Sequence, residues 1–375
     1  MAGSVYGERF RVMTWGESHG KGIGVVVDGC PAGLSLEEAD IQALLDRRRP
    51  GQSRFTTQRD EADAVEICSG VFEGRTTGTP ISLEVRNKDQ RSRDYSAIKD
   101  IYRPGHADFT YDAKYGFRDY RGGGRSSGRE TIGRVAAGAI AQKLLGTLGI
   151  GVRAYTKAVG GIAVDPARFD LEKMWENRLY MPDPKAAEEA EAFLAEAMAR
   201  KDSVGGVAEC VITGLPAGIG EPVFDKLDAC LAKAVLSIGG VKGFEVGDGF
   251  RAAKALGSEN NDPFRLDKAG RAETGTNHAG GILGGISDGA PVVFRAAIKP
   301  TPSIASVQQT VTRDGKEQEL EIKGRHDPII VPRAVVVVEA MAALTVADLL
   351  LTGMMSRMEW VHKIYGGPYE DRDGK

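Results

Sequence analysis

The sequence predicts a single α/β domain, of the α+β type, in which short strands and helices alternate. Short stretches in which apolar residues alternate with polar ones, as in strands, are separated by longer stretches that have apolar residues at helical spacing or begin with a capping residue. The 375 residues can bury a sizeable core, and no low-complexity stretch marks a domain boundary. We therefore expect one domain over residues 1–375, with a mobile tail at 366–375.

In the N-terminal part, residues 36–48 are predicted to form a helix, with Ser35 as its N-cap and two glutamates in its first turn. Two strands are expected over residues 65–72 and 81–86, because both are rich in apolar residues and a turn-rich segment separates them. Residues 131–141 place apolar side chains at helical spacing and predict a second helix.

In the C-terminal part, the pair Asp183-Pro184 predicts the start of a strongly acidic helix over residues 186–201. Residues 207–212 alternate like a strand, and residues 222–237 again have a helical pattern. The last long helix is predicted at 335–357, opened by Pro332, with its apolar face packed in the core. Strand and helix units therefore occur in two similar halves, although residue identity shows no internal repeat.

A glycine-rich segment, residues 121–131, is the most informative part of the chain. It combines glycines and serines with Arg121, Arg125, Arg129 and Glu130 directly before the helix at 131–141. Glycine lets the backbone approach a ligand closely, and backbone N–H groups and arginines donate to anions. We interpret the segment as an anion-binding loop, because a flexible linker seldom carries this pattern before an alanine-rich helix.

Two further segments, residues 15–20 and 323–328, are equally rich in polar donors. His19 lies in the first and His326 in the second, and His106 and His278 also have Gly, Arg or Asp as neighbours. Histidine is the natural proton carrier near neutral pH. Each histidine alone could be a structural residue, but as a set they favour a catalytic site.

These motifs, taken together and in order, are similar to the chorismate synthase family over nearly the whole chain. The three that carry most weight are Gly16-Glu17-Ser18-His19-Gly20, the loop and helix from Arg121 to Ala139, and Arg325-His326-Asp327-Pro328. Four others lie between them, at residues 47–54, 103–108, 277–287 and 299–303. Gly128 and Gly239-Gly240 depart from the residues most common in that family.

The resemblance implies a β-α-β sandwich, in which a helical layer lies between antiparallel sheets. It implies a 1,4-anti elimination of phosphate from 5-enolpyruvylshikimate 3-phosphate, which gives chorismate for aromatic amino-acid biosynthesis. The family requires reduced FMN without net redox change. We expect NADPH to be the ultimate reductant, through a separate flavin reductase because no extra nicotinamide domain is seen. A cytoplasmic homotetramer is also implied.

By the same resemblance, His19 donates a proton to the departing phosphate and His106 protonates the reduced flavin ring. Asp327 works with flavin N5 to remove the ring hydrogen, unless it only forms a turn before the following proline. Ser18 and Ser127 are candidate proton relays, or they only hydrogen-bond the loop backbone.

Flavin contacts and phosphate contacts are also carried over residue by residue. The expected flavin-binding residues are Arg125, Ser126, Ser127, Gly239, Gly240, Gly284, Lys299, Pro300, Thr301, Pro302, Ser303 and Arg325. The expected ligands of the substrate or NADP phosphate are Arg48, Arg49, Arg54 and Arg129. A run of arginines is often only a solvated surface, and the family match is what favours binding here.

Composition limits the other possibilities. The net charge of −3 and the lack of exposed aromatic patterning argue against nucleic acid and acidic membranes. The four cysteines have no metal-ligand or disulfide spacing, so we expect no metal site. The N-terminus has no signal-peptide pattern, which favours the cytoplasm.

Two rival functions remain open. A non-catalytic flavin or nucleotide-binding module would need no proton-transfer residues and would release no phosphate from the enolpyruvyl substrate. An NADPH-dependent flavin reductase would oxidise NADPH continuously without that substrate.

Overall fold

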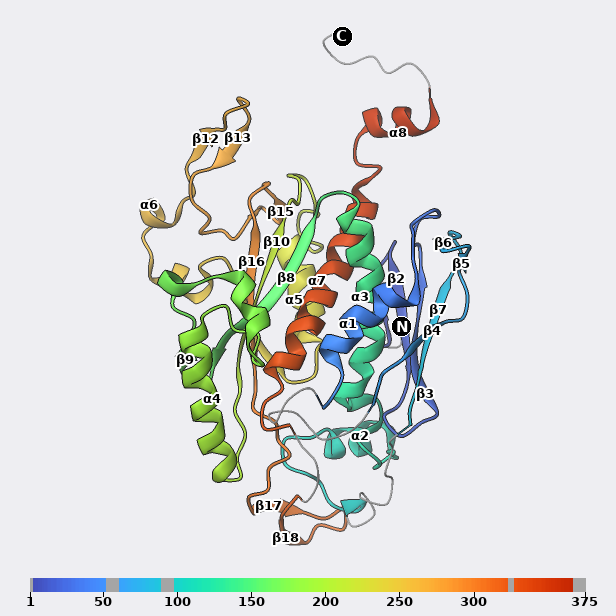
Figure 1. Ribbon diagram of the computed structural model, residues 1–375, viewed down its shortest axis with the longest axis vertical. Coiled ribbons are helices and arrows are strands. Elements are labelled where there is room, and N and C mark those ends of the chain that lie inside the picture. Colours follow the sequence, from blue (N-terminus) through green and yellow to red (C-terminus); the bar gives the residue numbers. More distant parts are fainter. Residues whose placement is uncertain (1–2, 52–60, 89–97, 323–326, 367–375) are drawn as a thin grey trace.

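Two five-stranded antiparallel sheets enclose a layer of helices in the computed structural model, which describes residues 3–51, 61–88, 98–322 and 327–366 (Figure 1). The first sheet lies on one side of the helices and the second on the other. This arrangement is the sandwich that the family resemblance implied, and the predicted fold class is confirmed.

The first sheet has the strand order β1 (Val5–Tyr6), β2 (Arg11–Gly16), β3 (Gly22–Asp28), β7 (Ile81–Arg86) and β4 (Val65–Ile67). The second has the order β11 (Val241–Val246), β16 (Val292–Ile298), β10 (Gly206–Thr213), β8 (Gly151–Val159) and β9 (Ile162–Ala163). Small hairpins are formed by β5 (Val71–Phe72) with β6 (Arg75–Thr76), β12 (Phe264–Leu266) with β13 (Ala272–Thr274), β14 (Ile282–Leu283) with β15 (Ile286–Ser287), and β17 (Gln308–Val311) with β18 (Glu317–Leu320).

The helical layer consists of α1 (Glu38–Arg48), α3 (Thr131–Gly146), α5 (Leu227–Leu236) and α7 (Val331–Gly353). Of these, α3 packs on β3, α7 packs on β8 and β10, and α3 and α7 pack on each other. The remaining helices are α2 (Asp108–Tyr115), α4 (Pro184–Ala199), α6 (Gly257–Asn260) and α8 (Met358–Tyr365), with short 3₁₀ helices η2 (Gly124–Ser126), η3 (Gly128–Glu130), η4 (Pro166–Arg168), η5 (Leu171–Glu176) and η6 (Gly249–Lys254).

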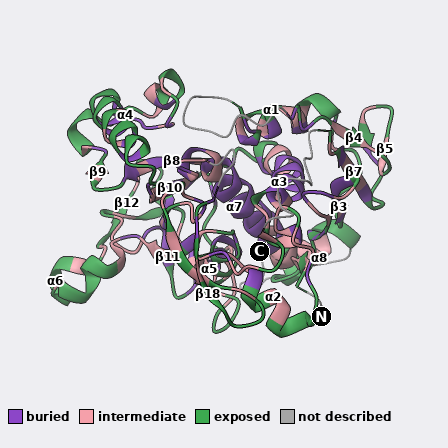
Figure 2. Cartoon of the chain, turned by 90° about the horizontal axis from the view of Figure 1, so that it is seen from below, coloured by how far each residue is buried: buried purple, intermediate pink, exposed green. Residues whose placement is uncertain are grey.

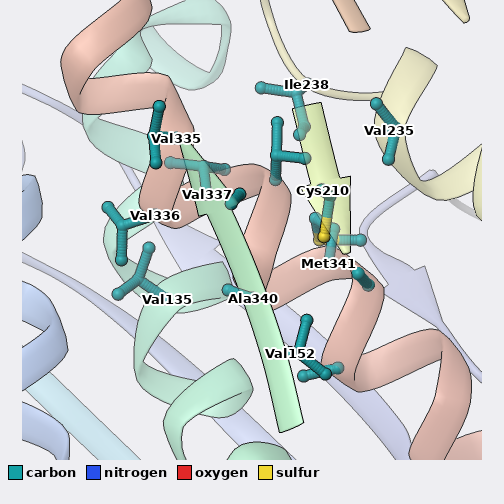
Figure 3. Packing of buried hydrophobic residues seen from close by; sticks show 14 of the residues in the cluster. Val135, Val152, Cys210, Val235, Ile238, Val335, Val336, Val337, Ala340 and Met341 are labelled. Atoms are coloured by element: carbon teal, nitrogen blue, oxygen red, sulfur yellow. The ribbon is translucent and has the colours of Figure 1, made fainter. Parts of the chain in front are cut away.

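The core follows the contact between α3 and α7, where buried residues concentrate (Figure 2). Helix α7 is apolar on all sides, as expected of a helix enclosed by other elements, and its valines pack against Val135, Val152 and Cys210 (Figure 3). The two helices approach closely because Gly138 has no Cβ, and one built there would lie 2.4 Å from the Cβ of Ala340.

Helix α7 is also long and apolar enough to cross a membrane, with a mean hydropathy of 2.2 over its most apolar window. However, 83% of that window is buried inside the protein. The apolar character of this helix is therefore explained by its place between the two sheets.

Several predicted elements have the expected positions. The strands predicted at 81–86 and 207–212 correspond to β7 and β10, and the helix predicted at 131–141 is the first part of α3. The acidic helix is α4, and the Asp183 side chain caps it by accepting hydrogen bonds from the backbone N–H groups of Lys185 (3.1 Å) and Ala186 (3.2 Å).

Other boundaries were wrong. Helix α1 begins at Glu38 with Glu37 as N-cap, because Ser35 instead pairs with Arg75 in a β-bridge. The strand expected at 65–72 is divided into β4 and β5 at Gly70, whose φ is +82°. Helix α5 starts five residues later than predicted. Helix α7 begins and ends four residues before the boundaries predicted for the last helix, and α8 lies beyond the predicted range. The tail at 367–375 lies outside the described residues.

Candidate active site

A cavity of about 1160 Å³ lies where α3 and α7 begin and α5 ends, at the lower end of the helical layer in Figure 1. Helix N-termini carry a partial positive charge and present N–H donors. Segments far apart in sequence line this cavity, and they include the three most characteristic motifs and the segments at 103–107, 239–240 and 299–303. The fold therefore brings together most of the motifs that the sequence singled out.

His19 lies on the loop between β2 and β3 and lines the cavity. The Ser18 hydroxyl donates to the carbonyl oxygen of Gly122 (3.1 Å) and lies 3.0 Å from Nδ1 of His19. Because the single hydroxyl hydrogen goes to the carbonyl, Nδ1–H of His19 is the donor to Ser18 Oγ. Gly122 has a φ of +60°, and a Cβ at this position would lie 2.2 Å from the His19 ring. The glycine-rich loop thus fixes the orientation of His19.

His106 lies in the turn before α2, where both ring nitrogens have partners. Nδ1 lies 2.9 Å from the carbonyl oxygen of Pro104, so it must carry the proton, and Nε2 accepts from the Ser303 hydroxyl at 2.8 Å. Burial and the neighbouring Arg103 guanidinium lower the pKa of His106 to about 4. Without an anion beside it, this imidazole is neutral at pH 7.

Asp327 lies four residues before the start of α7 and also lines the cavity. Its Oδ2 accepts a hydrogen bond of 2.7 Å from Nη1 of Arg333, which lies in the first turn of α7. Arg333 Nε donates in addition to the carbonyl oxygen of Arg48 at 3.0 Å. The carboxylate is therefore oriented by an arginine that is itself attached to the end of α1.

Two predicted phosphate ligands, Arg48 and Arg129, share one buried carboxylate. Arg48 donates to Thr131 Oγ1 (3.0 Å), to the carbonyl oxygen of Gly128 (2.6 Å) and to Asp63 Oδ2 (3.1 Å). Arg129 donates to the other oxygen of Asp63 at 3.0 Å. Both guanidinium groups line the cavity.

In the glycine-rich loop, the side chains mostly organise the loop itself. The Arg125 guanidinium reaches back to β2 and donates to Thr14 Oγ1 (2.7 Å) and to the carbonyl oxygen of Gly16 (3.1 Å). Ser126 Oγ donates to a loop carbonyl, and Ser127 Oγ accepts from the backbone N–H of Arg129 at 3.3 Å. All three predicted flavin ligands nevertheless line the cavity.

The segments at 239–240 and 299–303 lie side by side, because the backbone N–H of Lys299 donates to the carbonyl oxygen of Gly240 (2.9 Å). Burial and, secondarily, Lys242 lower the pKa of Lys299. Thr301 Oγ1 is buried without a hydrogen-bond partner in the described part of the chain, and a buried polar atom of this kind calls for an explanation. Of this segment, Lys299, Thr301, Pro302 and Ser303 line the cavity, and Pro300 does not.

Two expected ligands lie away from the cavity. Gly284 belongs to the turn between β14 and β15, which contacts the N-terminal end of α5, whereas the cavity is at the C-terminal end of that helix. The Arg49 side chain is 46% exposed and faces Asp46 at 3.7 Å. Arg54 and Arg325 lie outside the described residues, as does His326.

Sequence reasoning missed several cavity or supporting groups. Arg103 belongs to the motif at residues 103–108, and its guanidinium is held by Asp108 through hydrogen bonds of 2.8 and 2.9 Å. The spacing of Arg, His and Asp in that motif could have identified it. Asp63 and Arg333 gave no such signal, because a carboxylate in an acidic run and an arginine after a proline both look like surface residues.

Cationic groups outnumber acidic ones around the cavity. The cationic lining residues are Arg48, Arg103, Arg125, Arg129, Arg134, Lys233, Lys299 and Arg333, and the acidic ones are Glu130 and Asp327. Low local dielectric strengthens the attraction of such a site for anions. The described residues contain no cluster of His, Cys, Asp or Glu that could hold a metal ion.

Comparison with known proteins agrees with this chemistry. The family model for chorismate synthase matches residues 10–351. The chain belongs to the chorismate synthase family. A chorismate synthase of Lachnoclostridium phytofermentans is 65% identical over 97% of this chain and 100% of its own length, and one of Methanocella arvoryzae is 58% identical over 94% and 95%. A crystal structure of chorismate synthase superposes with a TM-score of 0.76 at 33% identity, covering 96% of each chain.

Membership in the chorismate synthase family gives the chain the activity that the resemblance implied. It is a carbon–oxygen lyase of the shikimate pathway that eliminates phosphate from 5-enolpyruvylshikimate 3-phosphate to form chorismate.

Proposed function

We propose that the cavity holds reduced FMN and 5-enolpyruvylshikimate 3-phosphate together, with His19, His106 and Asp327 as its proton-transfer groups. The observation that carries this proposal is the convergence of these three side chains, from separate parts of the chain, on one cavity lined by an excess of cations. The substrate bears a phosphate and two carboxylates, and FMN bears a further phosphate. A strongly cationic cavity fits this pair of ligands.

The lining fits FMN on two grounds. The unpaired Thr301 hydroxyl lies beside Lys299 and Ser303 in one segment, a donor set suited to a phosphate. A Cβ built at Gly239 would meet no atom within 4 Å, so the backbone there is open to a planar ligand. Reduced FMN, when bound, supplies the electron density that an elimination from a non-acidic C–H bond requires.

The two histidines have different roles in proton transfer. His106 is neutral at pH 7 and accepts a hydrogen bond at Nε2. An anionic ligand nearby favours the imidazolium, so His106 takes up a proton only as the ligands bind. His19 holds Nδ1–H on Ser18, so it acts as a general acid in the imidazolium form, with Nε2–H as the proton that goes to the departing phosphate.

Asp327 is placed to receive the ring hydrogen. Its contact with Arg333 fixes the carboxylate orientation. Arg48 and Arg129 bind the substrate phosphate, because guanidinium groups match phosphate geometry. In the net reaction, the substrate loses one ring hydrogen and its phosphate and gains a ring double bond, with no net redox change.

The organisation of the enzyme is also a proposal. We infer a single domain, because both sheets pack on the same helical layer. By family resemblance we propose a cytoplasmic homotetramer that obtains reduced FMN from a separate NADPH-dependent reductase. A light-scattering mass near that of one 40.0 kDa chain would contradict the tetramer. Efficient turnover with NADPH and oxidised FMN alone would contradict the separate reductase.

The test of the central proposal is anaerobic phosphate release from the enolpyruvyl substrate, with dithionite and FMN supplied. We expect turnover that depends on both reductant and FMN. Binding of FMN without phosphate release would instead support a non-catalytic module. Continuous NADPH oxidation without the substrate would support a flavin reductase.

A further inference from the structure

Asp63 is a buried carboxylate with an unusual environment. Its residue is 2% exposed, and among the described residues it does not belong to the cavity lining. Oδ2 accepts from Arg48 Nη1 at 3.1 Å and Oδ1 accepts from Arg129 Nη1 at 3.0 Å. One carboxylate thus holds two guanidinium groups, one on each oxygen. We call Arg48, Asp63 and Arg129 the arginine clamp.

The two arginines come from different elements and are fixed by further contacts. Arg48 ends α1 and donates to Thr131 at the start of α3, while Arg129 lies in η3 and donates to Asn87 Oδ1 at 2.8 Å. These contacts use three of the five N–H bonds of Arg48. Each guanidinium therefore has a fixed position at the cavity.

The clamp brings several charged groups close together. Asp63 pairs with both guanidinium groups, the Glu61 carboxylate lies 4.0 Å from Arg129, and Arg333 contacts the Arg48 backbone. Burial, then Arg333 and Arg129, lower the pKa of Arg48 to about 9, and Asp63 is the neighbour that opposes this. A phosphate in the cavity would accept charge-assisted hydrogen bonds from these guanidinium groups.

The backbone at Asp63 supports a functional role. Its φ is +47°, in the left-handed region, which Asp tolerates better than most residues but which is still uncommon. Such conformations occur where the surrounding structure imposes them, often at functional sites. This one turns the carboxylate between the two arginines instead of toward solvent.

We propose that Asp63 is a positioning residue for the substrate, which holds Arg48 and Arg129 at a fixed spacing so that together they bind a phosphate dianion. Asp63 makes no contact with the substrate itself. The proposal rests on the proposed role of the two arginines in substrate binding. A carboxylate that only stabilised the fold would affect unfolding without changing substrate affinity selectively.

The test compares Asp63→Asn with Asp183→Asn as a matched control. Asp183 is also fully buried and holds Arg168 at 2.8 Å, but it caps α4 and does not line the cavity. We expect Asp63→Asn to raise both the KM for 5-enolpyruvylshikimate 3-phosphate and its calorimetric Kd at least tenfold, with a smaller change in kcat. Asp183→Asn should lower the melting temperature and leave KM and Kd unchanged.

A second readout is rescue by the conservative variant. Asp63→Glu restores the charge, should recover part of the affinity, and serves as the test variant if Asp63→Asn does not fold.

The outcomes separate this proposal from the proposed function. If the wild type binds the substrate in calorimetry but shows no turnover, the proposed function is rejected. The variants would still test the clamp through their substrate affinity. A wild type that binds no substrate overturns the clamp. A wild-type Kd in a folded Asp63→Asn would also overturn it, as would a wild-type Kd in Asp63→Glu, whose longer side chain changes the spacing of the two arginines.

Discussion

Arg47 and Arg48 are neighbours on α1, yet their surroundings differ completely. Arg47 makes two hydrogen bonds to Glu339 of α7, at 2.8 and 3.0 Å, and its guanidinium carbon lies 5.1 Å from the centre of the Trp175 ring. Glu339 also accepts from Gln142 Nε2 (3.0 Å) and the backbone N–H of Ala154 (3.1 Å). In this network a fully buried carboxylate receives four donors, and the network lies in the core away from the cavity.

The arginine clamp contains the same kinds of groups but lies at the cavity. There, Asp63 holds two buried arginines that both line the cavity, whereas the second arginine near Glu339, Arg153 at 3.7 Å, is 43% exposed. Paired buried charges maintain the fold, and breaking them leaves an uncompensated charge. Excess charge at a cavity instead attracts a ligand. Position at the cavity, more than burial, thus separates the structural arginine from the proposed binding arginine.

The largest expected effect is on stability, from Glu339→Gln. The amide cannot neutralise Arg47, which would leave a mostly buried cation without its ion pair, at a cost of about 3–5 kcal/mol in the free energy of unfolding. Chemical denaturation followed by circular dichroism measures this, and enzyme that remains folded should keep a normal KM. An unchanged denaturation midpoint would show that the Glu339 network is not needed for stability.

The contrast between these neighbours also shows what the sequence could and could not predict. Residues 131–141, Asp183 and the strand at 81–86 carry local signals in capping and periodicity, and these elements were found as predicted. By contrast, nothing in the local sequence distinguishes Arg47, Arg48 and Arg49 from one another.

Successive residues on a helix point about 100° apart, since one turn takes 3.6 residues. Three consecutive arginines must therefore face three directions. Which direction meets Glu339, Asp63 or solvent depends on chain segments far away in sequence. The family motifs predicted most of the cavity lining. The carboxylates that support it could not be identified, because their contacts also depend on distant segments.

The next largest effect is expected from Arg48→Met. Removing one cation of the arginine clamp should reduce kcat/KM about a hundredfold, or ~2.7 kcal/mol of transition-state stabilisation. Stability should change less than in Glu339→Gln, because Asp63 keeps Arg129 as a partner. Steady-state phosphate release and thermal melts measure the two effects. If Arg48→Met lost stability but retained its kcat/KM, the two arginines would have the same structural role.

His106→Ala should have a smaller effect, lowering turnover by roughly tenfold or more while FMN and substrate still bind. Its melting temperature at pH 7 should stay within a few degrees of the wild type. Anaerobic phosphate release, flavin binding and thermal melts on one preparation measure these quantities. A folded variant with unchanged turnover would remove His106 from the mechanism.

The pH dependence of stability gives an independent check on His106. Its pKa is lowered from 6.5 to about 4 in the folded protein, so between these values the unfolded chain binds the proton more readily. This histidine therefore makes the folded state lose stability as pH falls from 6.5 toward 4. His106→Ala should lose less stability than the wild type over that window. If the melting temperatures of the wild type and His106→Ala fell equally with pH, the environment assigned to His106 would be rejected.

The smallest effect is expected from Arg49→Gln, which completes the comparison along α1. The Arg49 side chain is 46% exposed, and its facing carboxylate, Asp46, is 47% exposed at 3.7 Å. Exposed ion pairs of this kind contribute at most about 1 kcal/mol, and many contribute nothing measurable. We therefore expect a melting temperature and a kcat/KM close to those of the wild type. A large rise in KM for the substrate would instead mean that Arg49 binds a phosphate group, as its position in the arginine run suggested, and that position at the cavity is not enough to identify the binding arginines.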